Sequence, residues 1–130
     1  MQLARGIPGK IIINTSNKTM KTSEIKFTIK LDENKLPVSI DWEATDDKEK
    51  SECKSIMIAL WDKKENSTMR IDLWTKDMLV DEMKQFFHQT LVSMADTFQR
   101  ATGETEIVGD MKDFSIYFAD KMKLKQQSDN

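Results

Sequence analysis

Residues 23–44, SEIKFTIKLDENKLPVSIDWEA, decide how the first part of this chain folds. Apolar and polar side chains alternate in two runs, as is typical of strands with one buried face. Pairing the runs as an antiparallel hairpin keeps every apolar side chain on one face, whereas a shift of one residue would turn one strand over. The predicted pairs are Leu31 with Val38, Ile29 with Ile40, Phe27 with Trp42 and Ile25 with Ala44.

A second hairpin is predicted from CKSIMIALWD (residues 53–62) and TMRIDLW (residues 68–74), which KKEN joins. The charged run TDDKEKSE (residues 45–52) between the hairpins is expected to be a solvated loop, because it lacks the ligand order and the glycine of a calcium-binding loop. The sequence thus predicts a four-stranded antiparallel meander. The predicted pairs in the second hairpin are Leu60 with Met69, Ile58 with Ile71 and Ile56 with Leu73.

The strand at residues 53–62 is apolar on both faces. The pairs above take one face inward, so tryptophan and methionine side chains remain on the outer face. Antiparallel sheets commonly leave one face to water, and tryptophan and arginine are frequent anchors of protein interfaces. We therefore predict an interface on the outer face, formed by Met57, Ala59, Trp61, Arg70 and Trp74.

Two amphipathic helices are predicted after the strands. The first has Asp77 as its N-cap and ends near Gly103, and the second covers residues 105–124. Both are expected to pack on one face of the sheet, which makes the predicted fold α+β. The predicted stripes are Val80, Met83, Phe87, Leu91, Met94, Phe98 and Ala101, then Ile107, Met111, Phe114, Phe118 and Met122.

Catalytic chemistry finds little support. The single histidine, His88, is predicted at the edge of the first stripe, close to Asp81, in a solvated or hydrogen-bonded role. A zinc site needs three or four ligands, and no base is placed beside the single cysteine, Cys53. No glycine-rich loop that could hold phosphates is present. We predict no catalytic residue, no metal, no cofactor and no enzymatic activity.

Composition sets the class of protein. The chain has 130 residues, a net charge of −2 and 32% charged residues, so a soluble protein is expected. The sequence has no basic stripe that would favour nucleic-acid binding. No apolar run approaches the roughly 18 residues of a membrane span. One cysteine fits a reducing compartment, so a cytoplasmic location is expected. We predict a poorly ordered extension at residues 1–20, a single domain at 21–125 and a polar tail at 126–130.

Five runs together resemble the GldC family of gliding motility proteins of Bacteroidetes: SEIKFTIKLDENKLP, IMIALWD, RIDLWTKDM, VDEMKQFFHQTLVSMADTF and MKDFSIYFADK. The resemblance covers about residues 21–125, and VDEMKQFFHQTL is its most specific part. It implies a small soluble accessory protein of the gliding apparatus, which in these bacteria is tied to type IX secretion. It supplies no catalytic residues.

Two mechanisms remain open. The first is an interaction protein that contacts partners of the gliding machinery, or further copies of itself, through the outer sheet face. The second is a holdase chaperone similar to SecB, which shares the predicted ββββαα order, is tetrameric and binds unfolded chains. Topology alone does not fix function.

Overall fold

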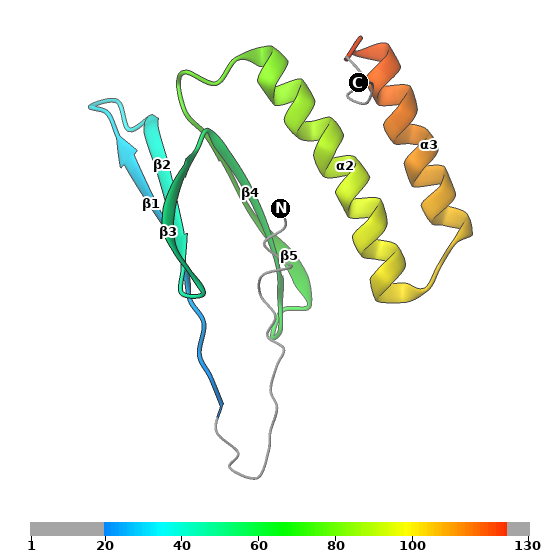
Figure 1. Ribbon diagram of the computed structural model, residues 1–130, viewed down its shortest axis with the longest axis horizontal. Coiled ribbons are helices and arrows are strands. Elements are labelled where there is room, and N and C mark those ends of the chain that lie inside the picture. The colour runs from blue at the N-terminus through cyan, green and yellow to red at the C-terminus, as the bar shows by residue number, and fades with distance from the viewer. Residues whose placement is uncertain (1–19, 125–130) are drawn as a thin grey trace. The chain divides into compact units, whose positions relative to one another are not determined.

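The computed structural model describes residues 20–124. The fold is α+β, with two antiparallel sheets and two C-terminal helices (Figure 1). The chain divides into two compact units, a strand unit that ends at Asp77 and a helix unit that begins at Met78. The elements in order are β1 (Ile25–Leu31), β2 (Pro37–Ala44), β3 (Asp47–Cys53), β4 (Ser55–Asp62), β5 (Ser67–Trp74), α2 (Val80–Thr102) and α3 (Glu106–Lys121).

The first predicted hairpin is confirmed in three of its four pairs, Ile29–Ile40, Phe27–Trp42 and Ile25–Ala44. The pair Leu31–Val38 is wrong, because the register shifts and Leu31 lies opposite Pro37. The turn explains the shift. The carboxylate of Asp32 accepts hydrogen bonds from the backbone N–H groups of Asn34 and Leu36, which closes the turn one residue earlier on the second strand.

The charged run predicted as a loop is instead strand β3, which pairs with β2. The prediction is wrong because charged side chains are compatible with a strand at a sheet edge as well as with a loop. A strand at a sheet edge needs only one neighbour, and charged side chains there discourage pairing with other chains. With β3 in place, β2 is the central strand, and Ile40 on it is 0% exposed.

The second predicted hairpin is confirmed in all three of its pairs. It does not join the first in one four-stranded meander, because β1–β2–β3 and β4–β5 form separate sheets. The strand path bends at Lys54, whose carbonyl oxygen accepts a hydrogen bond of 2.8 Å from the N–H of Thr75. The N–H of Lys76 donates to the carbonyl oxygen of Pro37 at 3.0 Å, which ties the two sheets together at this end. Figure 1 shows β3 and β4 meeting at the bend and separating away from it.

Helix α2 begins after Leu79, not after Asp77 as predicted. The carboxylate of Asp77 instead accepts a hydrogen bond of 2.6 Å from the hydroxyl of Thr75. At the helix start, the carboxylate of Glu82 accepts the N–H of Leu79 at 2.8 Å. The predicted end is confirmed, because Gly103 follows the helix with a φ of 79° and donates its N–H to Gln99.

Helices α2 and α3 form an antiparallel pair (Figure 1). The residues buried between them are mostly small, namely Ala95, Val108, Ser115 and Ala119, and small side chains let helices approach closely. His88 lies in this contact, with its ring stacked on Phe118 at 6.4 Å between centroids. The predicted hydrogen-bonded role of His88 near Asp81 stays a prediction. The prediction that both helices pack on one face of the sheet concerns a contact between the two units, and it stays a prediction.

Candidate interaction surface

The two-stranded sheet β4–β5, called the ribbon below, carries all five residues predicted as an interface. Its register places Ala59 opposite Arg70 and Trp61 opposite Thr68, and alternation along each strand fixes the face of each side chain. Met57, Ala59, Trp61, Arg70 and Trp74 therefore share one face, together with Asp72. We call this surface the tryptophan face.

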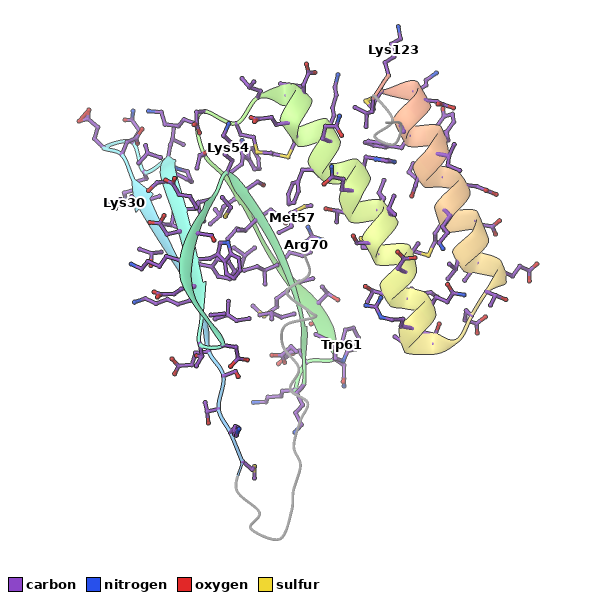
Figure 2. The ribbon with its side chains drawn as sticks, in the orientation of Figure 1. Lys30, Lys54, Met57, Trp61, Arg70 and Lys123 are labelled. Carbon is purple, nitrogen blue, oxygen red and sulfur yellow. The ribbon has the colours of Figure 1, made fainter. Side chains whose placement is uncertain are left out.

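The two indole rings stand open to solvent. Trp61 is 68% exposed and Trp74 is 54% exposed, while Met57 between them is half-buried. Trp74 pairs with Ser55 at one end of the ribbon and Trp61 lies near the other, so about 20 Å of strand separates them. Figure 2 shows Met57, Arg70 and Trp61 on the side of the ribbon that points away from β1–β3. Two large apolar side chains on one open face are more than a solvated sheet surface requires.

An ion pair lies between the two indoles. Arg70 and Asp72 are two residues apart on β5, on the same face, with 2.6 Å between Nη2 and Oδ1. Both side chains remain nearly half exposed, so this pair adds little to stability. The remaining N–H groups of the Arg70 guanidinium are hydrogen-bond donors in a fixed geometry for a partner that covers the face.

The opposite face of the ribbon is apolar as well. Ile56 is buried near the Lys54 bend, whereas Leu60, Met69 and Ile71 toward the other end are exposed. Sequence alternation located these residues on one face but could not show how far the three-stranded sheet covers it. A lone two-stranded hairpin is only marginally stable in water. Burial of its apolar faces against another protein surface would therefore stabilise the ribbon.

Polar contacts at the end of the ribbon next to Lys54 hold its position, and no sequence pattern predicts them. Lys76 Nζ lies 2.8 Å from Asp32 Oδ2, and this hydrogen bond lowers the pKa of Asp32 to about 2, with help from the N–H of Leu36. Buried Thr75 donates its hydroxyl to Asp77, which lowers the pKa of that carboxyl. These contacts hold residues 75–77, which directly follow Trp74, in place.

None of the groups considered for catalysis belongs to the tryptophan face. His88 is in the α2–α3 contact, and burial raises the pKa of the Cys53 thiol, which lowers the fraction of reactive thiolate. Within residues 20–124, no three His, Cys, Asp or Glu side chains gather as a metal site would require. In the same part of the chain, no helix combines the length and apolar character of a membrane span.

Comparison with known proteins identifies a family. A family described as gliding motility-associated protein GldC-like matches residues 37–124, from the start of β2 to just beyond α3. The matched range contains both strands of the ribbon and thus the whole tryptophan face. No curated protein and no solved structure matches the chain.

Proposed function

The chain belongs to the GldC-like family of gliding motility-associated proteins, and we propose that it serves the gliding machinery as a non-catalytic protein that binds a protein partner through the tryptophan face. The observation that carries this proposal is the exposure of Trp61 and Trp74 on one face of the ribbon. Tryptophan and arginine dominate the residues whose removal costs protein interfaces the most binding energy.

The surface also limits the chemistry of the partner. A complementary partner offers apolar pockets for two indoles about 20 Å apart, with a carboxylate or carbonyl between them for the Arg70 guanidinium. Such spacing suits a folded surface or an extended segment of about seven residues, because six steps of about 3.3 Å along a strand cover about 20 Å.

The proposed setting is the cytoplasm of a gliding member of the Bacteroidetes, on the inner side of the apparatus linked to type IX secretion. The single cysteine and the balanced charge of −2 support this setting. The same charge balance gives no footprint for nucleic acid.

A cross-linking pull-down from a gliding cell tests the proposal. The double variant Trp61→Ala/Trp74→Ala is compared with wild type and with Leu31→Ala/Leu36→Ala, which removes two exposed apolar side chains outside the ribbon. Loss of two anchors at about 2 kcal/mol each predicts at least a tenfold drop in the partner recovered, and a gliding defect. The control should recover the partner as wild type does. Equal recovery by both double variants, with unchanged circular dichroism, would refute the proposal.

A holdase role is the second candidate, and the apolar surface on both faces of the ribbon favours it. A holdase would suppress the aggregation of an unfolded client in a purified mixture, and the Trp61→Ala/Trp74→Ala variant would do so less well. A protein dedicated to a folded partner would leave the aggregation unchanged. Light scattering of a chemically unfolded client therefore separates the two functions.

A further inference from the structure

Helix α2 carries an apolar stripe that its contact with α3 does not use. The α3 contact lies on the side of His88 and Ala95, and the stripe lies roughly 90° around the helix at about 100° per residue. Most of its large side chains are exposed, with Val80 at 72% and Met94 at 52%. The stripe consists of Val80, Met83, Phe87, Met94, Phe98 and Ala101, and half-buried Leu91 borders it on the side toward α3.

The stripe is free of charge along the whole helix. The charged residues of α2 all lie on its other sides, and Thr90 and Thr97 border the stripe. The polar side carries three acidic residues against two basic ones, which disfavours an anionic lipid surface as the occupant. An uncharged stripe about 35 Å long, on a helix of 23 residues, instead fits another protein surface.

The order of side chains along the stripe is nearly symmetric about its midpoint, between Thr90 and Leu91. When a second α2 is laid against the first in the opposite direction about this point, each large residue meets a suitable neighbour. Phe87 lies opposite Met94 and Phe98 lies opposite Met83, which are favourable sulfur–aromatic contacts. Val80 lies opposite Ala101.

We propose that two copies of this chain associate through the stripe, with their α2 helices antiparallel and a twofold axis at Thr90–Leu91. The exposed apolar side chains Ile107 and Phe114 of α3 fall on the same side of the helix pair and extend the contact. A face two helices wide, about 35 Å by 20 Å, offers on the order of 700 Å² per copy, close to the roughly 800 Å² of stable complexes. This contact uses no residue of the tryptophan face and stands independently of the proposed partner.

Site-specific cross-linking tests the direction and register of the two helices. In the full chain carrying Cys53→Ala, Thr90→Cys places the two introduced thiols beside the twofold axis. Thr97→Cys is the matched control, because the antiparallel register separates its two copies by about 20 Å along the helix. A short bismaleimide should link the Thr90→Cys chains efficiently and the Thr97→Cys chains at least tenfold less. Equal linking, or stronger linking at position 97, would overturn the register.

Sedimentation of the purified full chain tests the association itself. Wild type should be a dimer at tens of micromolar, and Met94→Glu should raise its dissociation constant at least a hundredfold, because the twofold axis buries the new charge twice. Val92→Glu adds the same charge to the other side of α2 and should leave the dimer intact. A monomeric wild type would overturn the proposal. It would do so also if Met94→Glu lowered stability, since that result would mean that the stripe is covered within a single chain. Dissociation by Val92→Glu but not by Met94→Glu would overturn it too.

Discussion

Truncation of Ile40 should be the most damaging single change in the strand unit. This side chain is 0% exposed on central strand β2, between Ile29 on β1 and Cys53 on β3. Ile40→Ala removes three carbons, which at about 0.8 kcal/mol each gives roughly 2.4 kcal/mol of lost transfer free energy. The cavity left in a strand flanked on both sides adds to this, so we expect a loss of about 3–4 kcal/mol in the free energy of unfolding.

Urea unfolding followed by tryptophan fluorescence measures this loss, because Trp42, Trp61 and Trp74 all lie in the strand unit. Ile40→Val should cost about 1 kcal/mol. The control Leu31→Ala, at a side chain that is 54% exposed, should cost about 1 kcal/mol or less. If Ile40→Ala costs no more than Leu31→Ala at an unchanged denaturant slope, Ile40 is not the centre of a packed core and the burial argument fails.

Three further changes have defined outcomes. Gly103→Ala should destabilise the helix unit by about 1 kcal/mol, because a φ of 79° is strained for a residue with a side chain. Gly109→Ala lies inside a helix with open space around it and should stabilise the unit by about 0.5–1 kcal/mol. Thermal unfolding followed by circular dichroism measures the sign of both changes. Asp32 has its pKa lowered from 3.8 to about 2, so its contribution to stability is full above about pH 4 and is lost as the pH falls toward 2. The stability difference between wild type and Asp32→Asn should shrink over that pH range, and a constant difference would contradict the Lys76 contact. Thr75→Val removes the hydroxyl that donates to Asp77 from a buried position and should cost about 1–3 kcal/mol in urea unfolding, while Thr68→Val on the open ribbon should cost less than 1 kcal/mol.

Alternation of side chains was sufficient to predict both hairpins. Pairs such as Phe27–Trp42 and Ile58–Ile71 follow because a one-residue slip would move apolar side chains to the opposite face. The shift at Leu31 depended on hydrogen bonds to the Asp32 carboxylate within the turn, which alternation does not encode. Strand β3 was missed because its pairing comes from β2, not from its own apolar content.

Helical periodicity predicted where α2 and α3 lie but not which sides they bring together. The apolar stripe of α2 is predicted to pack on the sheet, and α3 packs along another side of the helix, that of Ala95 and His88. Small residues such as Ala95, Ser115 and Ala119 decide that contact because they allow close approach, and a pattern of large apolar residues does not register them. The five predicted interface residues share one face because strand parity alone places them there.

Hydroxyl-radical footprinting of the purified chain, read by mass spectrometry at each tryptophan, tests the open tryptophan face most directly. Half-buried Trp42 on β2 serves as the internal reference. Trp61 and Trp74 should be oxidised several-fold faster than Trp42 in the isolated protein and should become protected when the cross-linked partner is bound. Oxidation of Trp61 and Trp74 as slow as that of Trp42 in the isolated protein would contradict a docking surface on the ribbon.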